Sequence, residues 1–296
     1  MAASPVDVPV LGSLSPSRAS DFMTCPLLYR LRTIDRLPST PSPAATRGTV
    51  VHSVLERLYD LPAVERTIEA AASLLRPEWE QLLAAEPDVG ALFSTEGELT
   101  TWLASARDLL ASYFSLEDPT RLEPIERERL VEVVLPGGLR LRGIVDRIDQ
   151  APSGDLRVVD YKTGRSPGEL FEGKALFQMK FYALVLWRTR GVVPRLLQLL
   201  YLGDREVLRY SPDEADLLAV ERKLLALWEA IDRATTAREF LPRPSKLCGW
   251  CDFKALCPSF GGTPPAFPAV LPAADNPLPH QRAAVEAARV SAALRP

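Results

Sequence analysis

The stretch from Gly143 to Gly164, GIVDRIDQAPSGDLRVVDYKTG, decides the fold of this chain because it has the pattern of a β-hairpin. Two runs rich in β-branched and apolar residues, 139–149 and 156–162, lie on either side of the turn-forming residues 151–155. We therefore expect two antiparallel strands joined by a turn, with their apolar side chains buried on at least one side.

Charged side chains on this hairpin predict a metal site. Asp160 and Lys162 are two residues apart and share a face of their strand, and Asp146 shares it if the hairpin register allows. Two carboxylates and an ammonium are costly to bury unless they bind something, and Mg²⁺ with a phosphate group would satisfy all three. The alternative is an exposed strand face with a weak ion pair. The apolar neighbours Val158 and Val159 argue against that alternative.

Length and composition place the chain among ordinary globular proteins. It has 296 residues, of which 47% are hydrophobic and 25% charged, enough for one large domain or two small ones. No run is as long as a membrane span and no signal peptide opens the chain, so we expect a cytoplasmic protein without membrane contact. The net charge of −3 argues against a surface covered with phosphate contacts, but it leaves room for a local basic groove.

The order of predicted elements indicates an α/β fold. Helical periodicity covers 47–59, 62–116 with breaks near Pro77 and Pro87, 174–189 and 212–234. Strand patterns cover 125–135, the two arms of the hairpin, 196–202 and 207–210. Helices, three strands, a helix, two strands and a helix predict a mixed central sheet flanked by helices.

Domain limits follow from composition. We expect a flexible N-terminal tail over 1–13 and a single domain over 14–260, with a helical subdomain at 62–120 and the sheet core at 121–210. Residues 38–46 are predicted to be a Pro/Ser-rich connection. A Pro/Ala-rich tail, flexible or loosely docked, is predicted for 261–296, with a short helix over 280–294.

Three further side chains are candidates for the carboxylate site. His52 lies at the edge of the apolar stripe of its helix, where it can project onto the site, although most lone helical histidines are surface or core residues. Gln178 and Tyr182 are one turn apart and share a helix face. The simplest interpretation is that Tyr182 packs and Gln178 is solvated; the alternative is that both contact nucleic acid.

Three cysteines predict a second metal centre. Cys248, Cys251 and Cys257 have the spacing C-x2-C-x5-C, within a cysteine segment at 243–258. A fourth thiolate would have to come from Cys25, which taken alone would be a small buried residue. Four thiolates suit tetrahedral zinc or an iron–sulfur cluster. The arrangement of one plus three favours a [4Fe–4S] cluster that joins the two ends of the domain.

Taken together, these motifs resemble the RecB-type nucleases of the PD-(D/E)XK superfamily, close to the CRISPR-associated and AddB-type members with an iron–sulfur staple. The matching stretches are LSPSRASDFMTCPLLYR from Leu14, RGTVVHSVLE from Arg47, GIVDRID from Gly143, VVDYKTG from Val158, QMKFY from Gln178 and CGWCDFKALCP from Cys248. They run in the family order over most of the chain. Asp160 stands where many relatives have Glu, and Asp also occurs in this branch.

The resemblance implies a PD-(D/E)XK restriction-endonuclease-like core and assigns a role to each matching position. The metal ligands would be His52, Asp146, Asp160 and the Tyr161 carbonyl, holding one or two Mg²⁺ or Mn²⁺ ions. Lys162 would position or activate the attacking water, with Gln178 and Tyr182 supporting the site and the DNA. Cys25, Cys248, Cys251 and Cys257 would bind the [4Fe–4S] cluster. Glu56 and Asp149 lie near the motifs and would contact the metal ligands without binding the metal themselves.

These roles imply a metal-dependent DNA nuclease, an exonuclease on single-stranded DNA ends that works in DNA repair or recombination. The sequence has no GxxxxGK[ST] motif, so the nuclease would act alone or beside a separate helicase. One alternative is a non-catalytic or weakly catalytic DNA-binding subunit of a helicase–nuclease complex. Another is a structural protein built on the four cysteines. Both leave the Asp146, Asp160 and Lys162 set without a purpose.

Overall fold

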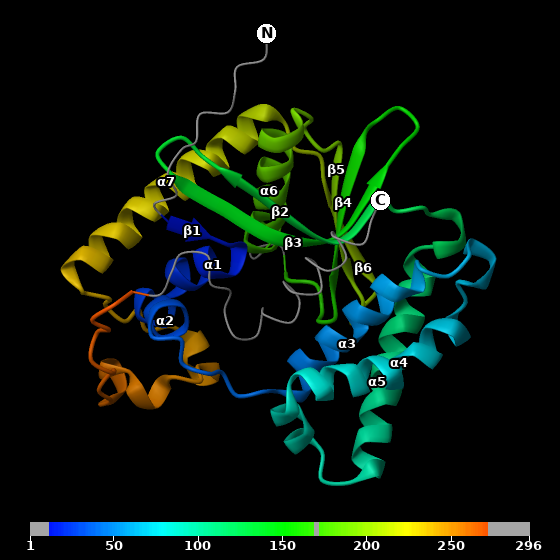
Figure 1. The fold of residues 1–296 in the computed structure, drawn as a ribbon, viewed down its shortest axis with the longest axis horizontal. Helices are drawn as coiled ribbons and strands as arrows, with labels where there is room; N and C mark the ends of the chain where they lie inside the picture. Colours follow the sequence, from blue (N-terminus) through cyan, green and yellow to red (C-terminus); the bar gives the residue numbers. More distant parts are fainter. Residues whose placement is uncertain (1–11, 169–171, 272–296) are drawn as a thin grey trace.

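In a computed structural model of the chain, which describes residues 12–168 and 172–271, a six-stranded mixed sheet carries helices on both faces (Figure 1). The strands are β1 (Gly12–Leu14), β2 (Glu126–Val134), β3 (Leu139–Gln150), β4 (Leu156–Lys162), β5 (Leu196–Tyr201) and β6 (Glu206–Tyr210). The sheet order is β1-β3-β4-β5-β6, and β2 also pairs with β3. The α/β prediction and the central hairpin are confirmed, because β2, β3 and β4 are antiparallel and β4 pairs with β5 in parallel.

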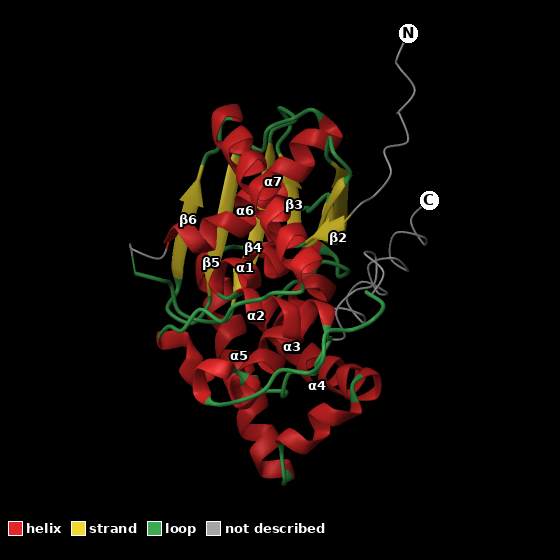
Figure 2. Ribbon diagram, turned by 90° about the vertical axis from the view of Figure 1, so that its left-hand side faces the viewer, coloured by secondary structure: helices red, strands yellow, loops and turns green. Residues whose placement is uncertain are grey.

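Helices cover the sheet as two groups with separate hydrophobic cores. The helices are α1 (Pro16–Thr24), α2 (Pro26–Tyr29), α3 (Pro43–Leu58), α4 (Ile68–Ala85), α5 (Glu96–Leu116), α6 (Glu172–Arg190) and α7 (Glu214–Ala237). Apolar residues of α1, α6 and α7 pack with Val158 of β4 in one core. Those of α3, α4 and α5 pack with Val159 and Tyr161 in the other, because consecutive strand residues face opposite sides. Figure 2 shows α6 and α7 against the strands and α3–α5 as a separate helical group.

The N-terminal part of the chain is more ordered than its composition predicts. Gly12 and Ser13, assigned to the flexible tail, belong to β1 and pair in parallel with β3. A Cβ on Gly12 would lie 2.0 Å from the Trp228 ring, so only glycine fits there. A three-residue strand is too short to show a periodic pattern, which explains why it was missed. Residues 1–11 lie outside the described part.

Two helix boundaries differ from prediction for local reasons. Helix α3 begins at Pro43, inside the predicted connection, because Ser42 caps it by accepting a hydrogen bond from the Ala45 N–H and proline suits the first helical turn. Helix α4 continues through Pro77 without the predicted break. Leu75 and Trp79 are buried on either side of this proline, and their packing compensates for the lost backbone hydrogen bond.

The C-terminal part of the described chain runs back along α1 and α2 (Figure 1). This part has short 3₁₀ turns over Lys246–Trp250, Lys254–Leu256 and Pro258–Phe260, with Cys248 in the first turn and Cys251 and Cys257 between turns. Part of the predicted tail is docked, because Phe267 stacks on Phe240 with ring centroids 6.1 Å apart. The predicted helix at 280–294 lies outside the described residues. No helix between residues 12 and 271 that the structure describes combines the length and apolar character needed to cross a bilayer.

Candidate active site

Three carboxylates form a row: those of Glu128, Asp146 and Asp160 occupy facing positions on β2, β3 and β4 where ladder pairing is interrupted. The pairs Arg127–Arg147 and Arg129–Val145 place Glu128 opposite Asp146, yet these two residues do not form a ladder pair. Pairing between β3 and β4 ends one step before Asp146 and Asp160 would meet. Glu128 has a positive φ of 42°, so β2 is distorted at this point. Like charges directly opposite one another destabilise a sheet, and here the β2–β3 ladder is interrupted at Glu128 and Asp146 and the β3–β4 ladder ends before Asp146.

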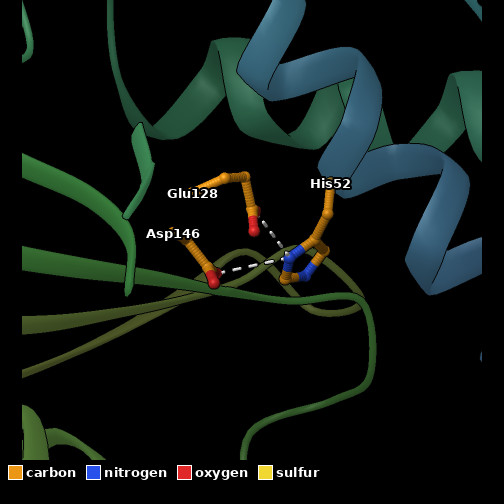
Figure 3. A group of neighbouring side chains, drawn as sticks. All are labelled: His52, Glu128 and Asp146. Atoms are coloured by element: carbon orange, nitrogen blue, oxygen red, sulfur yellow. Dashed lines mark ion pairs between the residues drawn. The ribbon is translucent and has the colours of Figure 1, made fainter. Parts of the chain in front are cut away.

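His52 from α3 completes a group of potential metal ligands. Its Nδ1 lies 3.4 Å from Oδ2 of Asp146 and 4.0 Å from Oε1 of Glu128 (Figure 3). Among the described residues, these three form the one group of at least three His, Cys, Asp or Glu side chains whose ligand atoms lie within 4.8 Å of one another. Two carboxylate oxygens and an imidazole nitrogen suit a divalent ion such as Mn²⁺ or Mg²⁺. Buried Val51 and Leu55 fix α3, and hence His52, against the sheet.

Asp160 and Lys162 form the second half of the site. Asp160 is 1% exposed, and its Oδ2 lies 2.6 Å from Nζ of Lys162. Asp160 and Lys162 therefore share a face as predicted, with Asp160 buried and Lys162 partly exposed, and the alternative of an exposed strand face is wrong for Asp160. Asp160 stands outside the group of three ligand atoms described above. Asp146 is oriented from β4 itself, because the N–H of Tyr161 donates a hydrogen bond of 2.8 Å to its Oδ2.

Helix α6 holds Asp160 and Lys162 together. Gln178 accepts a hydrogen bond from Lys162 at 2.9 Å and donates one to Asp160 at 2.8 Å. The same amide nitrogen lies 3.0 Å from the hydroxyl of Tyr182, so Gln178 is not simply solvated. The close approach of Tyr182 depends on Gly143, where a Cβ would lie 2.6 Å from the tyrosine ring. Gln178 and Tyr182 thus orient the acid and the amine rather than only filling space.

Crowded negative charge prepares the site for a cation. Burial and the charge of Asp160 raise the pKa of Asp146 from 3.8 to about 6. Burial and the charge of Asp146 raise the pKa of Glu128 well above its ordinary value. Burial lowers the pKa of Lys162, but Asp160 and Asp146 outweigh it and raise that pKa, so the amine stays charged. A divalent ion would relieve the repulsion between the carboxylates, and the residues present therefore fit such an ion.

Glu128 is the site residue that sequence reasoning missed. It lies in the charge-rich run IERERLVEVV, which matches no motif. A signal did exist, because Glu128 and Asp146 are each nine residues from Gly137 in the turn between β2 and β3. Folding the sequence about that turn places the two side by side. Of the two acids expected to act on the ligands, Asp149 is bound by Arg147 and Arg157. Glu56 is near enough that its charge helps to raise the pKa of Glu128.

The structure also brings the four cysteines together. Cys25, Cys248, Cys251 and Cys257 line one cavity of about 60 Å³ with apolar residues that include Leu27 and Phe253. The N–H of Arg243 donates to Sγ of Cys25, and the N–H of Ser245 donates to Sγ of Cys248, both at 3.3 Å. Cys25 is therefore not an isolated core residue.

Comparison with known proteins identifies the family. A model described as the PD-(D/E)XK nuclease superfamily matches residues 13–258. The gene 69 proteins of Mycobacterium phages L5 and D29 are 25% and 26% identical over 83% of this chain and 96% of their own length. One subunit of the ATP-dependent helicase/deoxyribonuclease of Streptococcus mutans is 25% identical over 56% of this chain, but over only 15% of its own length.

A solved structure shares the fold. The "Putative exonuclease" of Eubacterium rectale superimposes with a TM-score of 0.53 at 15% identity, covering 81% of this chain and 87% of that one. The family match covers the carboxylate row, Lys162 and the cysteine segment alike. By the extent of that match, this chain belongs to the PD-(D/E)XK nuclease superfamily.

Proposed function

We propose that the chain is a Mg²⁺- or Mn²⁺-dependent deoxyribonuclease that acts as an exonuclease on single-stranded DNA ends. The observation that carries this proposal is the row of Glu128, Asp146 and Asp160, with His52 at one end and Lys162 at the other. A divalent ion held there would offset phosphate charge and acidify water. His52, Glu128 and Asp146 would hold it, and Asp160 and the Tyr161 carbonyl would complete the ligand set.

The other residues of the site have roles set by their contacts. Lys162 stays charged and lies against Asp160, so it is placed to hold and orient the attacking water beside the phosphate. Gln178 fixes Lys162 and Asp160 at their present separation. Tyr182 fixes the amide of Gln178. The contacts of Gln178 and Tyr182 come from α6, which makes this helix the support of the proposed catalytic residues.

The four cysteines are proposed to bind a [4Fe–4S] cluster as a structural staple between α2 and the cysteine segment. Zinc bound by four thiolates would bring the sulfurs to about 3.8 Å from one another, given Zn–S bonds of ~2.3 Å. Within the described residues no three of these sulfurs lie within 4.8 Å of each other. A cubane cluster spreads its thiolates further apart, and the apolar cavity with its N–H donors to sulfur suits it.

The setting is proposed from the relatives. The streptococcal helicase/deoxyribonuclease subunits among them support a RecB- or AddB-like branch, a separate helicase as partner and a role in DNA repair or recombination. The second candidate function is a DNA-binding subunit without catalysis. It is disfavoured because such a subunit would not need buried, mutually repelling carboxylates, which destabilise the fold.

Cleavage of end-labelled DNA tests the proposal. Single-stranded and duplex substrates are incubated with Mg²⁺ or Mn²⁺ and with the wild type, Lys162→Ala or Lys180→Ala. We expect Lys162→Ala to lower the rate at least ~100-fold while DNA binding is retained, because it removes a charge at the reacting phosphate. Lys180 is the matched control. Like Lys162, it is a lysine in an ion pair with an aspartate, but it belongs to α6 and its partner Asp216 lies away from the site.

The labels also give the polarity, because 5′- and 3′-labelled strands release different products. Loss of activity in both lysine variants would point to a folding defect. Equal rates for Lys162→Ala and the wild type would remove the assigned role of Lys162. Absence of cleavage by a wild type that carries its cluster would favour the DNA-binding subunit.

A further inference from the structure

A buried arginine lies directly behind the carboxylate row. Arg147 is 1% exposed, the largest of the fully buried side chains described. Its Nη1 lies 2.8 Å from the hydroxyl of Tyr161 and 3.0 Å from that of Tyr59. Its Nη2 lies 2.7 Å from Glu117 at the end of α5, and its Nε lies 3.2 Å from Asp149. The arginine therefore joins α3, α5, β3 and β4 at one point.

Three of the elements that bear proposed ligands, α3, β3 and β4, have a residue in this Arg147 cluster. Arg147 directly follows Asp146 in β3. Tyr161 stands between Asp160 and Lys162 in β4. Tyr59, which ends α3, lies two helical turns after His52. The cluster thus meets α3, β3 and β4, three of the four elements that supply the proposed metal ligands, from the side of the sheet covered by α3–α5, and β2 with Glu128 is the fourth.

Tyr161 connects the cluster to the site itself. Its N–H donates to Asp146 at 2.8 Å, and its hydroxyl accepts from Arg147. Its ring meets the His52 imidazole edge-on, with centroids 5.9 Å apart and the planes at 89°. No other ring in the described residues makes such a contact with His52. The imidazole therefore contacts the Tyr161 ring, and its Nδ1 faces the carboxylates of Glu128 and Asp146 (Figure 3).

Stability alone does not account for a charged group in this place. Burying an arginine costs several kcal/mol before its partners offset it, and well-packed apolar residues often serve stability as well or better (about 1–4 kcal/mol). What a fully bonded arginine adds is a fixed geometry, because its planar group sets the positions of several oxygens at once. One of the oxygens that Arg147 bonds here belongs to Tyr161, whose ring contacts His52.

We propose that Tyr161 is a positioning residue for His52. In this proposal Arg147 fixes the Tyr161 hydroxyl, and the Tyr161 ring in turn holds the His52 imidazole in the orientation that binds the metal. The inference rests on the proposed metal site. Groups that orient a metal-bound histidine commonly change metal affinity by ~10–100-fold when removed. Tyr161 differs from the usual hydrogen-bonding partner because it orients the ring by an aromatic contact.

The first test needs no metal. The chain has two histidines, His52 and His280, so the imidazole proton region of an NMR spectrum is simple, and His280→Gln assigns it. We expect Tyr161→Leu to shift the His52 ring-proton signals, because the neighbouring aromatic ring is gone. Tyr113→Phe is the matched control, since Tyr113 belongs to the same cluster of hydroxyls but makes no ring contact with His52. It should leave those signals in place.

The second test measures Mn²⁺ binding by electron paramagnetic resonance in a double-mutant cycle with His52→Ala. We expect Tyr161→Leu to weaken Mn²⁺ binding about 10-fold in the wild type and to have no further effect once His52 is gone. Tyr161→Phe keeps the ring and should cause a smaller loss. Tyr113→Phe should lower the melting temperature as much as Tyr161→Phe while leaving Mn²⁺ affinity unchanged.

The outcomes separate this inference from the proposed function. If Tyr161→Leu weakens binding equally with and without His52, or leaves the His52 signals unchanged, the positioning role is wrong. If the wild type binds no Mn²⁺, the proposed metal site is wrong, while the NMR comparison still decides the contact between Tyr161 and His52. Should Tyr161→Leu not fold, the Tyr161→Phe cycle and spectrum decide in its place.

Discussion

At the scale of single residues, the site is a set of charges that the fold holds against their own repulsion. Glu128, Asp146 and Asp160 occupy facing positions on three strands without forming ladder pairs, and Lys162 lies 2.6 Å from Asp160. The cost of this arrangement is visible in the raised pKa values of Asp146 and Glu128, for which burial is the first cause. A bound cation would offset the repulsion between these carboxylates and so lower their pKa values.

The stability of the metal-free protein should therefore depend on Asp146. Its pKa in the folded state is about 6 against 3.8, so folding favours the protonated form. The stabilisation is complete below pH ~4 and is lost as the pH rises through 6, a change of at most about 3 kcal/mol at ~1.4 kcal/mol per unit. We expect the melting temperature in EDTA to fall between pH 4 and pH 8, and Asp146→Asn to reduce this fall.

Mn²⁺ is the control in that experiment. It should raise the melting temperature of the wild type at pH 8 but not that of Asp146→Asn, although the variant is the more stable without metal. An unchanged pH dependence in the variant would show that the crowded carboxylates do not strain the fold.

Glu128 gives a prediction of its own because no motif points to it. Its Oε1 is 4.0 Å from His52 and shares the ligand group with Asp146. We expect Glu128→Gln to weaken Mn²⁺ binding and cleavage by at least ~10-fold, as loss of one charged ligand should. Glu126→Gln is the matched control in the same strand, since Glu126 pairs with Arg129 and Arg190 instead. Equal effects of the two changes would place Glu128 outside the site.

At the scale of elements, the hairpin supplies the acids and α6 supplies their support. Sequence pattern located both, because strands of 7 and 12 residues and a helix of 19 residues are long apolar segments bounded by turn-forming residues. It did not locate β1, and it placed the start of α3 too late and a break at Pro77. These boundaries were set by contacts, namely pairing with β3, the Ser42 cap and the packing of Leu75 and Trp79.

The contact between α6 and β3 is tight enough to test. In Gly143→Ala the new methyl group would overlap the Tyr182 ring, which is buried and cannot move freely. We expect a loss of about 1–3 kcal/mol in the free energy of unfolding, measured by denaturant titration, and reduced cleavage as Tyr182 shifts away from Gln178. Gly97→Ala is the control, because a Cβ there meets only Thr95 at 3.9 Å. A fully active Gly143→Ala protein would mean that Tyr182 does not need its present position.

At the scale of the whole molecule, the cysteine site joins segments more than two hundred residues apart. Cys25 lies between α1 and α2, and the other three cysteines lie in the turns after α7. A group bound to all four would tie the two segments together. The closed loop includes strands β2–β6, so its effect should reach well beyond the cavity.

Cys257→Ala tests this staple. We expect protein purified without air to be brown with broad visible absorbance, and the variant to be colourless. The variant should also melt at a lower temperature and be cut more readily by protease within the cysteine segment. A colourless wild type that holds one equivalent of zinc would replace the [4Fe–4S] assignment with a zinc site.

Sequence patterns alone predicted the central hairpin, the mixed α/β fold and most of the residues gathered at the site. These features depend on local pattern, on the spacing of Asp160 and Lys162 along one strand, and on motif order. Only the tertiary structure placed Glu128 beside Asp146 and set Tyr161 between His52 and Arg147. Those relations depend on strand register, on where the strands part and on how α3 docks, which are settled by packing between segments far apart in the chain.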